Sequence, residues 1–172
     1  KYLHKDKFLS AVDSGFGFCN VVFGWDMADQ CYDNTTWTGW HTGFPDALAR
    51  IDLNTYRRVP WDDDVPFFLA DFDDGNGGPS SVCPRQLLKT VLGRAAARGW
   101  QVLSGVEYEW FNFRETPQTF AAKNFTQPQP ISPGMFGYSL IRAGQNQPFF
   151  KALMEEMPRF GIPIEGLHTE TG

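Results

Sequence analysis

The chain has 172 residues, of which 42% are hydrophobic and 20% charged, and its formal net charge is −5. This composition excludes a largely disordered protein, and the scattered basic residues argue against nucleic acid or an anionic membrane surface as a partner. No apolar run approaches the roughly 20 residues that a membrane-spanning helix needs. Because the three cysteines form no CxxC pair and the first residues lack an apolar leader, we expect a cytoplasmic protein with free thiols.

The first half of the chain predicts a short helix followed by a small sheet. Lys7 to Val12 has the pattern of a helix that ends near Gly15. Runs of aromatic and β-branched residues between turn-forming residues then predict strands. The expected strands are Phe16–Phe23, Thr36–Trp40, Arg50–Leu53 and Pro66–Phe72. The turn-forming residues from Asp73 to Pro79 predict a sharp loop, so we place a boundary there between domains at 1–77 and 78–172.

The second half predicts helices alternating with extended chain. Pro84 to Arg98 indicates a helix, because a proline suits the first turn, Gly99 suits the end, and apolar residues share one face. A strand is expected from Gln101 to Phe113, and the proline-rich stretch after it predicts a loop without regular structure. Apolar residues at helical spacing from Phe149 to Met157 predict another helix, which Pro158 should end or kink. This order of elements predicts an α+β fold.

Glu107 and Glu109 are the first candidate site residues. The period of two in a strand places both carboxylates on one face, with Tyr108 and Trp110 on the other. If that face is enclosed, the two charges repel unless a cation compensates them, which favours a Mg²⁺ or Mn²⁺ site. The alternative is a solvated acidic face on a half-exposed strand, and the spacing alone leaves that alternative open.

His168 and Glu170 repeat this spacing near residue 172 and would share a face of extended chain. They could join the first pair of glutamates around one cavity. Nitrogen and oxygen ligands together suit a hard divalent metal, and a histidine can also donate to a phosphate oxygen. The alternative is a polar cluster in a loop or at a helix end.

Several ordered blocks of this sequence together resemble the glutamine synthetase family. EYEWFNF at 107–113 and GIPIEGLHTETG at 161–172, after the helix at 84–99, are similar to the family's glutamate-rich strand and its later His- and Glu-containing strand. FCNVVFGWDMADQCYDN at 18–34 and ARIDLNTYRRVPW at 49–61 resemble its amino-terminal domain. The resemblance implies a β-grasp-like domain at 1–77 and, at 78–172, an incomplete catalytic domain of the glutamine synthetase and guanido-kinase type.

The resemblance also implies roles for the carboxylates and the histidine. Glu109 and Glu170 match ligands of the metal near the amino-acid substrate, and Glu107 matches a ligand of the metal on the ATP side. Glu170 would thereby also help bind the substrate. His168 matches the catalytic histidine that contacts the transferred phosphate. Two or more Mg²⁺ or Mn²⁺ sites per active site are expected, with ATP as co-substrate.

Two further residues are assigned by resemblance to the amine side of the reaction. Asp26 aligns with the family's amino-terminal aspartate, which reaches a neighbouring subunit's site and helps to deprotonate the incoming ammonium. Its loop departs from the family's usual Asp-Gly-Ser-Ser form, and the alternative is an aspartate that ends a strand. Tyr138 matches a substrate-binding tyrosine that lines the ammonium pocket, within a stretch that also differs from the family.

The function implied by the resemblance is ATP-dependent formation of glutamine from glutamate and ammonia through γ-glutamyl phosphate. One alternative is γ-glutamylation of a polyamine or alkylamine, and others are a non-catalytic structural relative and a simple metal-binding module. The expected partners are glutamate, ATP and ammonia or an amine, with no nucleic acid and no membrane. The resemblance further implies a ring-like homo-oligomer with sites between subunits, and we expect the 172-residue chain by itself to be inactive.

Overall fold

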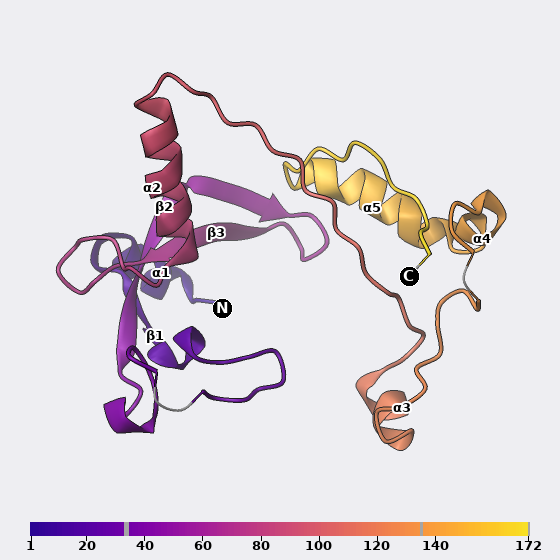
Figure 1. The fold of residues 1–172 in the computed structure, drawn as a ribbon, viewed down its shortest axis with the longest axis horizontal. Coiled ribbons are helices and arrows are strands. Elements are labelled where there is room, and N and C mark those ends of the chain that lie inside the picture. Colours follow the sequence, from indigo (N-terminus) through magenta and orange to yellow (C-terminus); the bar gives the residue numbers. More distant parts are fainter. Residues whose placement is uncertain (33–34, 135, 172) are drawn as a thin grey trace. The chain divides into compact units, whose positions relative to one another are not determined.

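The computed structural model describes residues 1–32, 35–134 and 136–171, which form two compact units. One unit comprises Lys1–Arg57 and Pro66–Leu103, and the other comprises Arg58–Val65 and Ser104–Gly172. A three-stranded sheet combined with α-helices confirms the α+β class (Figure 1). The domain boundary between residues 77 and 78, and the β-grasp and catalytic-domain folds, stay predictions.

The first unit begins with α1 (Lys5–Ser14), β1 (Phe16–Cys19) and two 3₁₀ helices, η1 (Asn20–Phe23) and η2 (Trp40–Thr42). It continues with β2 (Asp46–Val59) and β3 (Val65–Phe72), whose adjoining ends lie in the second unit, and then with α2 (Pro84–Ala96). Helix α1 ends where Gly15 adopts φ 74°. A Cβ atom there would lie 2.8 Å from the Ala49 carbonyl oxygen, so a glycine both ends the helix and lets β2 approach.

Aromatic rings fill much of the space around the sheet. The strand order is β1-β2-β3, and β1 runs antiparallel to β2 with Phe16 opposite Ala49. Phe72 on β3 meets Phe18 and Phe23 edge-on, with 6.0 and 4.8 Å between ring centroids. Among the described residues, the buried hydrophobic side chains are small: Ala11, Ala49, Val59 and Cys83. The larger rings therefore pack at the edge of the core rather than fully inside it.

Four charged side chains, which we call the four-charge cluster, connect α2 to the sheet. Arg85 donates to Asp71 on β3 at 2.7 Å and to Asp52 on β2 at 2.8 Å. Lys89, one turn later, contacts both carboxylates as well. These contacts, with the hydrogen bond from Arg85 foremost, lower the pKa of the Asp52 carboxyl to about 2. Because no residue of α2 is buried, ion pairs rather than apolar packing fix this helix.

The second unit contains α3 (Pro117–Ala122), α4 (Leu140–Gly144) and α5 (Gln147–Arg159). Helix α4 contacts α5, and the Trp61 ring lies 5.1 Å from the Phe160 ring just after α5. The predicted helix ending or kinking at Pro158 is confirmed in position, since α5 ends one residue later. Within the described ranges, none of the helices combines the length and the apolar character that a membrane crossing requires.

The prediction of an irregular loop after residue 113 is wrong at α3. Pro117 occupies the first turn of this helix, where its missing N–H costs no hydrogen bond. Thr116 accepts from the Thr119 backbone N–H, and the Thr119 hydroxyl in turn accepts from the Thr116 backbone N–H. This reciprocal cap starts a helix inside the proline-rich stretch.

Three predicted strands differ from the structure. The second part of Phe16–Phe23 is the 3₁₀ helix η1, and Thr36–Trp40 forms bends instead of a strand. Gln101–Phe113 runs without a strand arrow in Figure 1, and a single bridge joins Phe113 to Pro130. Extended chain becomes a strand only when a neighbour accepts and donates its backbone hydrogen bonds. Within the described residues, the Ile131 backbone N–H donates to the Asn112 carbonyl, but the stretch from Gln101 to Phe111 has no such neighbour.

Candidate functional site

Tyr138 and the residues around Glu170 form the centre of the candidate site, in the second unit. The Tyr138 hydroxyl donates to Glu170 Oε2 at 2.6 Å, and its backbone N–H donates to the Thr169 carbonyl at 2.8 Å. Tyr138 adopts φ 56°, a left-handed conformation that an aromatic residue rarely takes, so these two bonds offset backbone strain. A Cβ atom at Gly137 would lie 3.0 Å from Thr171, which makes glycine favourable where the two segments meet.

His168 completes what we call the Tyr138–His168–Glu170 cluster. Its ring stacks on the Tyr138 ring, with 5.0 Å between centroids and 25° between planes. His168 Nδ1 lies 3.3 Å from the Thr169 carbonyl oxygen and 4.0 Å from Glu170 Oε2. Because Nδ1 faces these oxygen atoms, Nε2 is the ring nitrogen left to meet a ligand. The side chain is half exposed, so a ligand could reach it.

The hydrogen bond between Tyr138 and Glu170 shifts the pKa values of the two groups in opposite directions. It lowers the pKa of the Glu170 carboxyl, with help from the Thr171 backbone N–H, because the carboxylate is the form that accepts these bonds. The same bond raises the pKa of Tyr138, because the phenol must keep its proton to donate. At neutral pH the cluster therefore holds a carboxylate and a neutral phenol.

Glu107 and Glu109 lie on the unpaired extended stretch and are both exposed. Their negative charges add to the rise in the pKa of Tyr138, so both act electrostatically on the cluster. The described residues contain no group of three or more His, Cys, Asp or Glu side chains close enough to hold a metal ion. The structure thus joins Tyr138, His168 and Glu170 directly, and it relates Glu107 and Glu109 to them through charge and not through shared coordination.

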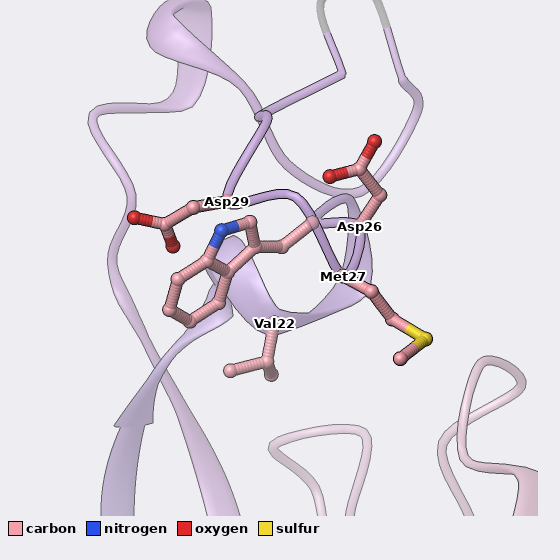
Figure 2. A pocket seen from close by; sticks show the side chains of 5 residues that line it. Val22, Asp26, Met27 and Asp29 are labelled. Carbon is pink, nitrogen blue, oxygen red and sulfur yellow. The ribbon is translucent and has the colours of Figure 1, made fainter. Parts of the chain in front are cut away.

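Asp26 lies in the first unit, in a loop that it stabilises itself. Its Oδ1 accepts the backbone N–H groups of Ala28 and Gln30 at 2.8 and 2.9 Å, and its Oδ2 lies 3.5 Å from the Tyr32 hydroxyl. A backbone bridge between Trp25 and Cys31 closes the loop. Figure 2 shows the Asp26 carboxylate directed away from Val22, which lies below it. One carboxylate oxygen of Asp26 is therefore committed to the loop, and the other is available for a further partner.

Thr169, which lies between two members of the cluster, is a polar residue that the sequence did not single out. Its Oγ1 is buried and has no hydrogen-bond partner among the residues that the structure describes. A buried hydroxyl without a partner costs about 1 to 3 kcal/mol, so this atom is suited to a water or ligand. The sequence contained a signal for this difference between Thr169 and its neighbours. In extended chain, the residue between His168 and Glu170 points to the opposite face.

The amino-acid sequence of the chain matches a known protein family. Residues 81–172, more than half of the chain, match the family model of the glutamine synthetase catalytic domain. The chain belongs to the glutamine synthetase family. This finding confirms the resemblance inferred from the ordered sequence blocks.

Three members of the glutamine synthetase family, from three organisms, align with all or nearly all of this chain. Type-1 glutamine synthetase 2 of Dictyostelium discoideum is 50% identical over 172 residues, the whole chain and 33% of the relative. The glutamate–isopropylamine ligase of a Pseudomonas species is 28% identical over the whole chain and 38% of its own length. A gamma-glutamylethanolamide synthetase of Streptomyces coelicolor is 29% identical over 95% of the chain and 36% of its own length. The chain thus spans about a third of the length of these relatives.

Proposed function

We propose that the complete protein containing this chain is an ATP-dependent ligase that joins the side-chain carboxylate of glutamate to an amine. The observation that carries the proposal is the Tyr138–His168–Glu170 cluster, on which the charges of Glu107 and Glu109 also act. Membership of the glutamine synthetase family supports the reaction class. The names of relatives that ligate glutamate to ammonia or to larger amines support the same class.

The proposed reaction has two steps that balance without further reagents. A carboxylate oxygen of glutamate attacks the γ-phosphorus of ATP, and ADP leaves. The amine nitrogen then attacks the acyl carbon of γ-glutamyl phosphate, phosphate leaves with the electrons of the broken C–O bond, and a carboxylate takes the proton from nitrogen. We assign His168 Nε2, when the ring is protonated, to donate to an oxygen of the transferred phosphoryl group.

The carboxylates of the site suit a divalent cation in their donor chemistry, although the described side chains are not gathered around one metal position. Glu107, Glu109 and Glu170 supply oxygen donors of the kind that Mg²⁺ and Mn²⁺ prefer, and their charges already act on one tyrosine. We propose Glu109 and Glu170 as ligands of one metal and Glu107 as a ligand of a second. When bound, such ions neutralise the repulsion between the glutamate carboxylate and the ATP phosphates. Without them, the three carboxylates would repel both anionic substrates.

Asp26 and Tyr138 are proposed to act on the amine. The Oδ2 atom of Asp26 is free of the loop's backbone hydrogen bonds and could accept a proton from an ammonium group. Tyr138 could line the amine pocket beside Glu170. Ammonia is our first candidate acceptor, which would make glutamine the product. The second candidate is an alkylamine or polyamine, and the apolar side chains that surround Asp26 favour it.

We further propose that activity requires the length that the relatives have beyond this chain, so that the 172 residues alone are inactive. Additional metal ligands and nucleotide contacts would lie outside this third of the relatives' length. A ring-like homo-oligomer with active sites between subunits is proposed for the complete protein. The competing class is a non-catalytic relative, which has no physical need for several carboxylates around a histidine.

The deciding experiment measures phosphate release by the complete protein from ATP, with glutamate, Mg²⁺ and either ammonium or a panel of amines. We expect amine-dependent release that falls by about a hundredfold or more in Glu109→Gln, since a lost metal ligand removes transition-state charge stabilisation. Glu155→Gln is the matched control, because Glu155 is exposed on α5 and, among the described residues, pairs only with Lys151, at 3.6 Å. No release with ammonium or any amine would support the non-catalytic class and reject the proposal.

A further inference from the structure

Arg142 connects the chain on the two sides of Tyr138. It lies on α4, shortly after Tyr138, and its guanidinium reaches back to the segment before the tyrosine. Its Nη1 donates to the Pro133 carbonyl oxygen at 2.7 Å, and the guanidinium carbon lies 4.1 Å from the centroid of the Phe136 ring. A charge-assisted hydrogen bond and a cation–π contact therefore act on the residues that lead into Tyr138.

The Phe136 ring packs against the backbone of its own segment. Gly134 adopts φ 82°, and a Cβ atom there would lie 2.6 Å from an atom of the Phe136 ring. Glycine admits this approach, because any other side chain would meet the ring. The contact between Arg142 and Phe136 is therefore passed on to the main chain before Tyr138.

The chain after Tyr138 is joined to Arg142 through the start of α4. The Ser139 hydroxyl accepts from the Arg142 backbone N–H at 3.3 Å and so caps the helix. Arg142 thus contacts the chain before Tyr138 with its side chain and the chain after it with its backbone. Tyr138 itself has φ 56°, a strained conformation that persists only where surrounding contacts fix it.

We infer that Arg142 is a positioning residue, which holds Tyr138 in the conformation in which its hydroxyl meets Glu170. Among the described residues, none of the hydrogen bonds and ring contacts of Arg142 goes to His168 or Glu170, so it acts on the cluster through Tyr138. For its effect on catalysis the inference rests on the proposed function, which assigns Tyr138 to the amine. Loss of the Arg142 contacts should therefore weaken the use of the amine and spare the use of ATP.

Two substitutions of Arg142 remove its contacts to different extents. A lysine ammonium is a compact point charge that can donate to the Pro133 carbonyl, but it lacks the flat guanidinium that covers the Phe136 ring at the same time. Methionine keeps an aliphatic side chain and has neither the charge nor an N–H group to donate. Arg142→Lys should therefore keep part of the arrangement that Arg142→Met loses.

The first test measures phosphate release by the complete protein from ATP, with glutamate, Mg²⁺ and ammonium. We expect Arg142→Met to raise the KM for ammonium about tenfold and to change the KM for ATP less than about twofold, because Tyr138 loses its place beside Glu170. Arg142→Lys should bring the KM for ammonium back to within about threefold of the wild type. A purely structural role would lower kcat with the folded fraction and leave both KM values unchanged, which would overturn the inference.

Arg159→Met is the matched control. Arg159 is an exposed arginine at the end of α5 in the same unit, and it donates to the Glu156 carboxylate at 2.7 and 2.9 Å. The control thus removes charge-assisted hydrogen bonds of similar length that do not involve the segment around Tyr138. It should leave the KM values for ammonium and ATP unchanged. An equal rise in the KM for ammonium in Arg159→Met and Arg142→Met would overturn the inference.

Amide hydrogen exchange separates this inference from the proposed function, because it requires no activity. The Tyr138 backbone N–H donates to the Thr169 carbonyl at 2.8 Å. In the complete protein, peptides that contain Tyr138 should exchange about tenfold faster in Arg142→Met than in the wild type, and Arg142→Lys should restore most of the protection. Absent phosphate release in the wild type would reject the proposed function, while this pattern of exchange would still support the positioning role. Equal exchange in the wild type and Arg142→Met would overturn the inference, whether or not phosphate is released.

Discussion

The four-charge cluster makes a quantitative prediction about how firmly α2 is attached to the sheet. Arg85→Met keeps an aliphatic side chain but removes the ion pairs at 2.7 and 2.8 Å to Asp71 and Asp52. Removing one partner of a buried ion pair costs about 3 to 5 kcal/mol. The cost should be smaller here, about 2 kcal/mol, because Arg85 is 26% exposed and Lys89 still contacts both carboxylates. This corresponds to about 30-fold more frequent opening of the helix.

Amide hydrogen exchange read by mass spectrometry is the suitable assay, because it reports on α2 alone within the complete protein. Peptides that cover Pro84–Ala96 should exchange about 30-fold faster in Arg85→Met than in the wild type. Arg94→Met is the matched control, since it removes an exposed arginine from the same helix, with no ion pair to Arg94 among the described residues. If the two variants exchange alike, the charges do not fix the helix and the reasoning is refuted.

Three further predictions concern acid, the tyrosine of the site and the cap of α3. As the pH falls from 5 to 2, the protection of α2 from amide hydrogen exchange should decrease. The Asp52 carboxylate stabilises the folded state fully above its ordinary pKa of 3.8, and this stabilisation is lost as the pH falls through about 2. Exchange protection factors measured across this pH range check the prediction. Tyr138→Phe should raise the pKa of the Glu170 carboxyl toward its ordinary value, because it removes the hydrogen bond from the phenol. An NMR titration of the protein with labelled glutamate residues measures this pKa, and an unchanged pKa would contradict the role given to the hydrogen bond. Thr116→Ala should weaken α3 by about 1 kcal/mol, seen as about fivefold faster exchange of that helix and of no other.

Helices that carry their own end signals could be predicted from the sequence. The predicted helix from Pro84 to Arg98 is α2, Pro84–Ala96, because a proline at its start and an apolar face are local features. Helix α3 differs from the predicted loop although its signals are also local: Thr116 caps the helix, and Pro117 suits its first turn. The strand predicted at Gln101–Phe113 depended on a partner, and no local pattern supplies one.

Contacts between distant segments were harder to predict. Asp52 and Asp71 are 19 positions apart, and only the pairing of β2 with β3 brings both to Arg85. The contact between Tyr138 and Glu170 was not predicted, because 32 positions separate the two residues and the family resemblance gave each of them a separate role. The local role of Asp26 was readable in principle, since aspartates often bond backbone groups two residues on.

The loop geometry around Asp26 determines which mutants can be interpreted. Asp26→Ala would remove the proposed proton acceptor together with two hydrogen bonds that shape the loop, so a loss of the proposed activity would not distinguish lost chemistry from a misfolded loop. Asn at this position keeps an oxygen for the Ala28 and Gln30 amides, and it removes the charge and the acceptor oxygen that the Tyr32 hydroxyl meets. Asp26→Asn keeps the turn and Asp26→Ala removes its hydrogen bonds. Comparing the two variants therefore separates a role of Asp26 in taking a proton from a role in holding the neighbouring Trp25 and Asp29 in place.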